Sequence, residues 1–138
     1  MTTLGSESRG ARLDQAGIGG EERPEALSRV AFGPTLVTLA LVLVEEAFGV
    51  DQADIVGEHR RAEMVEARHV AVWLLREATD AQHAMIATGL RRRTHVMSVQ
   101  GYWRVQERRK RDAAFRARTD AILATFRAAA RSADLPEI

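Results

Sequence analysis

Residues 89–105 read GLRRRTHVMSVQGYWRV, and the prediction of the fold depends on this stretch. Three arginines, Arg91 to Arg93, come directly before Thr94 and His95. From there apolar and polar residues alternate in steps of three and four, which is typical of an amphipathic α-helix. Thr94 suits the N-cap position, because its hydroxyl can accept a hydrogen bond from the first turn. The stretch predicts a cationic turn followed by a helix that begins at His95.

The residues on either side of this stretch carry helix signals and almost no strand signals. Pro34 suits a first helical position, and an apolar stripe continues from it until Gly49. Asp51 can cap a short helix that Gly57 ends. We expect further helices over residues 64–79, over AQHAMIATG after a cap at Asp80, and over residues 112–130.

The predicted fold class is all-α: a compact multi-helix domain containing a helix-turn-helix, with a disordered N-terminal leader. A chain of 138 residues suits a single core. We expect the leader over residues 1–30, because its sequence, beginning MTTLGSESRG, lacks the apolar centre of a signal peptide. The domain is expected over 31–131 and a flexible tail over 132–138. The most apolar run, residues 35–44, is far shorter than the roughly 20 residues that cross a bilayer, so no membrane partner is expected.

Charge is distributed unevenly along the chain. Residues 1–57 hold four arginines against nine acids, whereas residues 58–138 hold sixteen basic residues against ten acids. Residues 91–111 alone contain eight basic residues and one acid. Such a cluster either forms a solvated helix face or attracts a polyanion. Seven of the eight are arginine, whose planar guanidinium suits phosphates and guanine edges, and this favours nucleic acid.

The sequence offers little support for catalysis, a metal or a cofactor. It has no cysteine, and its four histidines are spaced by 10, 14 and 12 residues, which is not the spacing of a helical metal pair. No nucleophile stands beside a base in any recognisable arrangement. We predict that the protein is not an enzyme and has no catalytic residue, metal or cofactor.

Two short helices joined by a tight turn, the second opening with His95, are typical of a helix-turn-helix. The alternative is an ordinary packing corner of a helical bundle. Residues 43–126 give more specific information when they are taken as one unit: VEEAFGVDQADIV, a basic loop, ARHVAVWLLREAT, the IATGL helix, the arginine turn and a closing helix. This order resembles the C-terminal DNA-binding domain of the bacterial replication initiator DnaA. The resemblance implies an all-helical domain that binds short repeated boxes in duplex DNA.

The resemblance also implies roles for residues of the turn. The family's turn ends in a basic residue, an acid, a histidine and two hydroxyl residues. The basic residue is matched by Arg93 and the histidine by His95, while Thr94 stands at the acidic position. Val96 and Met97 replace the hydroxyl pair and offer apolar surface to a thymine methyl group. The residues expected to contact bases are His95, Val96, His69 and Thr94.

Upstream, an Arg-Gln pair of the family is matched by Arg68 and His69. The family's minor-groove arginine falls on Glu66, so either Arg60 and Arg61 take over its role or that contact is lost. The residues expected to contact phosphates are Arg60, Arg61, Arg68, Arg91, Arg92 and Arg93.

The expected function is sequence-biased binding of double-stranded DNA, in regulation of replication initiation or of transcription. No G-x-x-x-x-G-K-[ST] string occurs, so the chain is expected to be a free-standing domain without ATPase activity, cytoplasmic and associated with the nucleoid. The alternative is an interaction protein that kept the fold and lost specific DNA binding. It would bind a protein partner through its basic face, or form a homodimer through the apolar helix from Leu36 to Phe48.

Overall fold

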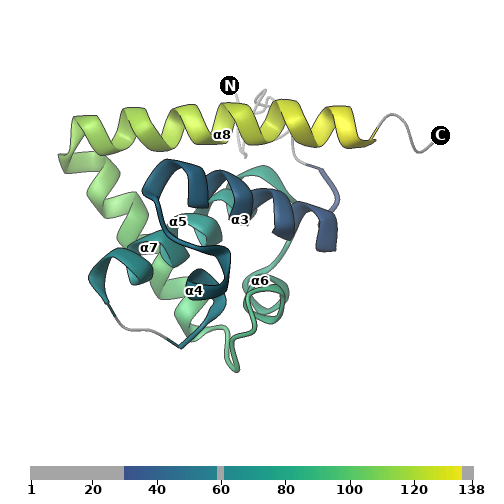
Figure 1. The fold of residues 1–138 in the computed structure, drawn as a ribbon, viewed down its shortest axis with the longest axis horizontal. Helices are drawn as coiled ribbons and strands as arrows, with labels where there is room; N and C mark the ends of the chain where they lie inside the picture. Colours follow the sequence, from purple (N-terminus) through teal and green to yellow (C-terminus); the bar gives the residue numbers. More distant parts are fainter. Residues whose placement is uncertain (1–29, 59–60, 135–138) are drawn as a thin grey trace, which may run out of the picture.

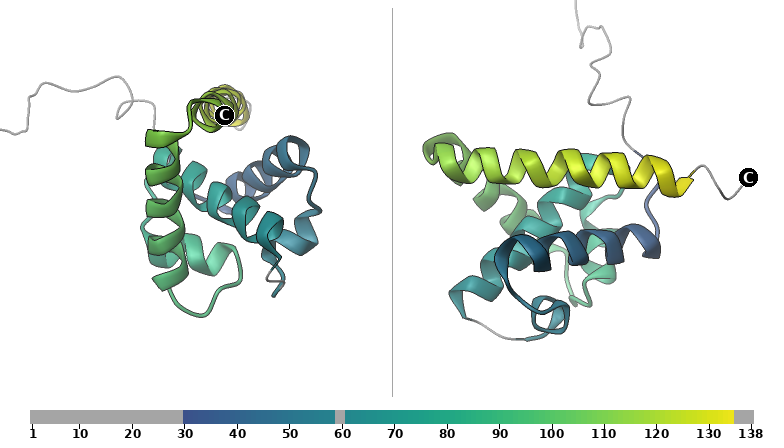
Figure 2. Two further views of the ribbon diagram at one scale, coloured as in Figure 1. Left: turned by 90° about the vertical axis from the view of Figure 1, so that its left-hand side faces the viewer. Right: turned by 45° about the horizontal axis from the view of Figure 1, so that its top comes forward.

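The computed structural model describes residues 30–58 and 61–134. Within these ranges six helices follow one another: α3 (Pro34–Phe48), α4 (Gln52–Val56), α5 (Ala62–Ala78), α6 (His83–Gly89), α7 (Val96–Arg111) and α8 (Ala113–Asp134). α8 lies as a long rod across one side of the other helices, and α7 descends steeply from its first end (Figures 1 and 2). The all-α prediction is confirmed. The predicted leader lies outside the described residues, apart from Val30.

α5 forms the centre of the core. Six consecutive residues of this helix, Val70 to Leu75, are buried, and α3, α4, α6, α7 and α8 all pack against it. A helix that is apolar around most of its circumference belongs in the interior of a domain. Trp73 is almost fully buried, and its indole Nε1 donates a hydrogen bond of 2.9 Å to Oε1 of Gln106 on α7.

Local signals determine the ends of α3. Pro34 is its first residue, and Gly49 follows its last residue in the left-handed conformation, with a φ of 69°. Glycine adopts this conformation without the steric cost that a side chain adds, so it commonly ends helices. The Gly49 amide donates a hydrogen bond of 2.8 Å to the carbonyl of Glu45. The predicted start and end of this helix are confirmed, and so is the short helix between Asp51 and Gly57.

The predicted cap at Asp80 is wrong. α6 begins at His83 with Gln82 at its N-cap position, and Oδ1 of Asp80 instead accepts a hydrogen bond of 2.9 Å from the amide of Phe32. The Asp80 amide also donates a hydrogen bond of 3.0 Å to the carbonyl of Val30. Asp80 therefore ties the segment before α3 to the end of α5, and this tertiary contact uses the carboxylate that the sequence pattern assigned to a cap.

α8 is longer than predicted. It runs to Asp134, so residues 132–134, which were predicted to start a tail, continue the helix. At its other end Asp112 caps it, because Oδ1 accepts a hydrogen bond of 3.0 Å from the amide of Phe115. This hydrogen bond, with the nearby Arg108 guanidinium, holds the pKa of Asp112 below its usual range. The apolar stripe of α8 is buried against α3, α5 and α7 at Phe115, Ile122, Leu123, Phe126 and Ala130.

The fold predicts that α8 contributes to the same cooperative core as α5. Phe126 is completely buried, so Phe126→Ala should lower the free energy of unfolding by about 3–5 kcal/mol. Thr125→Ala, at the exposed neighbouring position, should change it by less than about 0.5 kcal/mol. Urea denaturation followed by circular dichroism measures both. Similar stabilities for the two variants would contradict the packing of α8 on the core.

Candidate nucleic-acid interface

The turn between α6 and α7 is anchored by a buried leucine and reverses the chain sharply. Leu90 is fully buried, and Arg91 directly after it has a φ of 62°. A left-handed arginine carries some backbone strain that a glycine would avoid. The amide of Arg91 donates a hydrogen bond of 3.0 Å to the carbonyl of Thr88, and the amide of Arg92 one of 2.8 Å to that of Ala87. These bonds close α6 and direct the next residues outward.

The next residues form an exposed stretch at the start of α7. Arg93, Thr94, His95 and Val96 are all exposed, and Val96 keeps 51% of its surface accessible. α7 begins at Val96 with His95 at the N-cap position, so the predicted cap at Thr94 is wrong. The reason is that the His95 carbonyl accepts the first helical hydrogen bond, at 3.0 Å from the amide of Val99. The structure thus brings four of the predicted DNA contacts together.

Polar contacts between α5, α6 and α7 fix the orientation of the turn. Nδ1 of His83 lies 2.7 Å from Oγ of the buried Ser98. The rings of His83 and Tyr102 pack edge to face, with their centroids 5.8 Å apart. The Tyr102 hydroxyl in turn donates a hydrogen bond of 2.6 Å to Oε2 of Glu77 on α5. The two helices of the helix-turn-helix are therefore fastened to each other and to the core.

Arg68 and Arg92 both bind the carboxyl end of α4. Arg68 is only 5% exposed, and its guanidinium donates to the carbonyls of Ile55 at 2.6 Å and Gly57 at 3.0 Å. The Arg92 guanidinium donates to the carbonyls of Val56 and Gly57. The last carbonyls of a helix lack intrahelical partners and carry partial negative charge, so two cations satisfy them. We call this pair of side chains the arginine clamp.

The arginine clamp corrects two predicted phosphate contacts. The guanidinium of Arg68 is turned into the protein, where burial and the nearby Arg92 lower its pKa from the ordinary value. The Arg92 guanidinium shares the Gly57 carbonyl with Arg68, also binds that of Val56, and is only partly exposed. Both guanidiniums bind the carboxyl end of α4 in this structure. Of the other predicted phosphate contacts, Arg61 is exposed at the start of α5, whereas Arg60 lies outside the described residues.

His69 is a packing residue between α5 and α7. A Cβ atom placed on Gly101 would lie 2.7 Å from Cδ2 of its ring, so α7 approaches this closely only because residue 101 has no side chain. Burial, together with the charges of Arg104 and Arg68, lowers the pKa of His69 to about 4. The ring is therefore neutral at neutral pH. The ring also lines a pocket with Gln100 and Trp103 on the exposed side of α7, and its predicted base contact stays a prediction.

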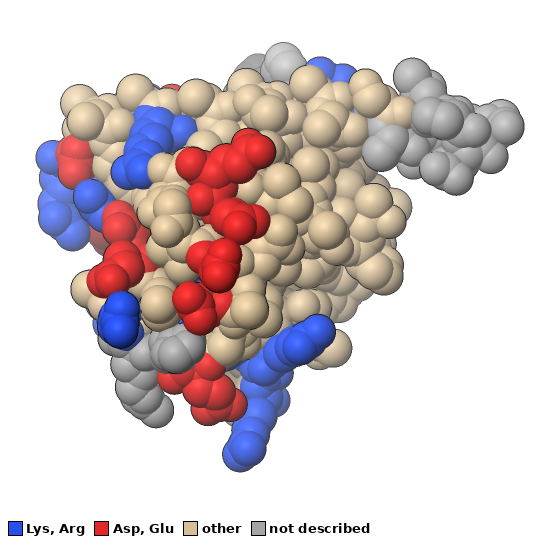
Figure 3. All heavy atoms as spheres, in the orientation of Figure 1, with Lys and Arg blue, Asp and Glu red and all other residues tan. Residues whose placement is uncertain are grey.

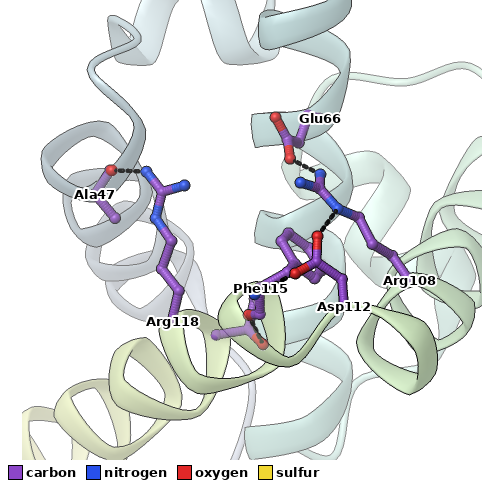
Figure 4. A network of polar contacts seen from close by, with 7 residues as sticks. Ala47, Glu66, Arg108, Asp112, Phe115 and Arg118 are labelled. Atoms are coloured by element: carbon purple, nitrogen blue, oxygen red, sulfur yellow. Dashed lines mark hydrogen bonds and ion pairs between the residues drawn. The ribbon is translucent and has the colours of Figure 1, made fainter.

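The acid at position 66 is paired within the protein. Oε2 of Glu66 accepts a hydrogen bond from the Arg108 guanidinium, which also reaches Oδ2 of Asp112 at 3.4 Å (Figure 4). The same guanidinium stacks 4.0 Å from the centroid of the Phe115 ring. A paired carboxylate repels phosphate less than a free one, so Glu66 is compatible with an anionic ligand nearby. Sequence reasoning missed Arg108 because it lies 42 residues away along the chain.

The face drawn in Figure 3 carries a band of acidic side chains with basic side chains on either side of it. Acids gather over the carboxyl end of α3 and over α4, where Glu46, Asp51 and Glu58 are exposed (Figure 3). Basic side chains project from the lower edge of Figure 3, where the turn between α6 and α7 lies in Figure 1. A polyanion is consequently attracted to the turn and repelled from the α3–α4 side.

Comparison with protein families agrees with this arrangement. The family model described as the bacterial dnaA protein helix-turn-helix matches residues 40–101, which run from within α3 to the second turn of α7. No curated protein matches the chain. Among the described helices, none combines the length and apolar character that crossing a membrane requires.

The burial of His69 predicts a loss of stability in acid. Its pKa is about 6.5 in the unfolded chain and about 4 in the fold, so the unfolded state binds more protons between these values. The free energy of unfolding should therefore fall as the pH is lowered from about 6.5 towards 4. His83, whose pKa is also lowered by burial, acts in the same direction.

Urea denaturation of wild type and His69→Gln over this pH range tests the effect. The variant should lose less stability on acidification, whereas Thr125→Ala, at an exposed position without a titratable group, should keep the wild-type pH dependence. An unchanged pH dependence in His69→Gln would show that this ring is not buried in its neutral form.

Proposed function

We propose that the protein binds duplex DNA with a preference for particular sequences, because the model of the bacterial DnaA helix-turn-helix, a DNA-binding and not a catalytic domain, matches residues 40–101. The observation that carries this proposal is the exposed stretch 93–96 at the amino end of α7. A helix end of this kind carries partial positive charge, and the first turn of a recognition helix meets base edges in the major groove.

The exposed residues divide between backbone and base contacts. Arg91 and Arg93 neutralise phosphates on either side of the groove, and Arg61 adds a third basic contact at the start of α5. Thr94, His95 and Val96 face the bases, with Val96 offering methyl groups to thymine. Arg68 and Arg92 act through the arginine clamp, by holding α4 and the turn in place.

We also propose a biological process for this DNA binding. The sequence has no G-x-x-x-x-G-K-[ST] string, so DNA binding is not coupled to a phosphate loop in this chain. We infer a role at the nucleoid, in which the protein occupies sites that control replication initiation or transcription. Occupying such a site requires only DNA binding.

A protein-binding role through the first helix receives less support. The apolar side of α3 is already buried, at Leu36, Val37, Ala40, Leu41 and Val44, against α5 and α8. A homodimer through this surface would have to displace α8 from the core. We therefore retain the interaction-protein alternative as an outcome of the DNA-binding test.

Fluorescence anisotropy with a labelled duplex tests the proposal. One duplex carries an initiator-type box and the other a scrambled sequence, at about 0.15 M salt, close to physiological ionic strength. Wild type should bind the box at least tenfold more tightly, equivalent to about 1.4 kcal/mol. His95→Ala should lose about 1–3 kcal/mol on the preferred sequence and little on the scrambled one.

Arg131→Ala provides the control, since it changes an exposed residue near the far end of α8 and should leave the preference unchanged. Equal binding to both duplexes would mean that the preferred sequence differs from the box. Binding to neither duplex would overturn the proposal and favour the interaction-protein alternative.

A further inference from the structure

We propose that Gln100 is a specificity-determining residue that reads an adenine in the major groove, one helical turn beyond the thymine contact of Val96. The inference rests on the proposed function, which it extends by naming a base and by placing A·T pairs beneath the first two turns of α7. Neither Gln100 nor the base was assigned by the sequence pattern of the turn.

The exposed face of α7 carries one stripe of residues. Val96, Gln100, Trp103 and Glu107 are all exposed and are separated by four, three and four residues, which places them on one side of a helix. The opposite side is buried through Ser98, Gly101 and Val105. Val96 and Trp103, which are 51% and 55% exposed, are two of the three large apolar side chains that are most exposed among the described residues. A stripe that exposes two large apolar side chains with a glutamine between them suits a bound partner.

The amide of Gln100 is available for a ligand. Among the described residues no hydrogen bond involves its side chain, whereas two other glutamines of the fold are committed: Gln106 to Trp73 and Gln52 to Glu45, each at 2.9 Å. A glutamine amide presents one acceptor and one donor side by side. Adenine offers the complementary pair in the major groove, the N6 amino group and the N7 acceptor.

Val96 lies one turn before Gln100 and presents only methyl groups. In the major groove the matching surface is the C5 methyl of thymine. The two side chains therefore select A·T pairs at neighbouring steps, Val96 by apolar contact and Gln100 by two hydrogen bonds. Contacts with the DNA phosphates and sugars alone would not discriminate between the bases.

Charged residues further along α7 limit how much of this helix can lie against the DNA. Arg104 is exposed and has no hydrogen-bonding partner among the described residues, so it can bind a phosphate at the wall of the groove. Glu107, one turn beyond Trp103, is an acid 3.4 Å from Lys110. Both side chains are exposed, so solvent weakens this ion pair, and the Glu107 carboxylate, unlike that of Glu66, still repels the DNA backbone. Base reading is thus confined to the part of α7 before Trp103.

Selection of binding sites from random-sequence duplexes tests the inference with wild type, Gln100→Ala and Gln100→Glu. Wild type should select a site with an adenine that Gln100→Ala no longer requires. Gln100→Glu keeps the shape of the side chain but only accepts hydrogen bonds, so it should replace that adenine by cytosine, whose N4 amino group donates. Anisotropy on the selected site should show roughly fivefold or greater loss of discrimination at that base pair for Gln100→Ala.

Gln100→Ala should bind a scrambled duplex as wild type does, because only base contacts are removed. Glu107→Gln is the matched control on the same stripe: it should raise affinity for every duplex and leave the selected site unchanged. If Gln100→Ala selects the wild-type site, Gln100 does not read a base, although DNA binding stands. If wild type binds no duplex, the proposed function and this inference both fail.

Discussion

The arrangement of the interface depends on the contacts that Arg68 and Arg92 make with the carboxyl end of α4. These residues lie on α5 and in the turn before α7, and they meet carbonyls that are 11 to 36 residues away along the chain. An arginine has five N–H donors in a planar group, so one side chain can satisfy several carbonyls. Three separate segments are thereby joined at one point, directly behind the exposed stretch 93–96.

The basic residues of α7 divide into those that bind other helices and those that remain exposed. Towards its carboxyl end, Arg109 donates hydrogen bonds of 2.7 Å to Oγ1 of Thr119 and 2.8 Å to Oδ1 of Asp120, and lies 4.6 Å from the centroid of the Trp73 ring. Arg108 is held by Glu66 in the same region (Figure 4). These cations attach α7 to α5 and α8. The arginines that remain for DNA lie before α7 and along its exposed face.

The helices were predictable from the sequence where local chemistry decides, as at Pro34 and Gly49, where the backbone preference of one residue sets the boundary. Asp80 and Thr94 show the opposite case. Either residue can cap a helix in isolation. In the fold, however, the Asp80 carboxylate binds the amide of Phe32, and the carbonyl of His95, one residue after Thr94, accepts the first hydrogen bond of α7. Caps therefore depend on tertiary partners that a local pattern does not contain.

Tertiary contacts also explain why some residues of the candidate site were predictable from the sequence and others were not. A count of arginines cannot separate Arg92 from Arg93, which are neighbours in sequence with one turned inward and the other exposed. His69 matched a residue of the family's pattern, but its packing against Gly101 depends on a residue 32 positions later in the chain and could not be predicted from the local sequence. Gln100 was detectable, because it stands four residues after Val96, but exposure of this face became evident only with α7 packed on α5.

The salt dependence of DNA binding tests the division between supports and contacts most directly. Each phosphate contact that is lost should flatten the plot of log affinity against log salt by about 0.9. The account predicts this flattening for Arg93→Ala. It predicts an unchanged slope for Arg92→Ala, whose affinity falls equally at all salt concentrations because the turn is displaced. A flattened slope for Arg92→Ala would show that Arg92 binds a phosphate and would contradict the account.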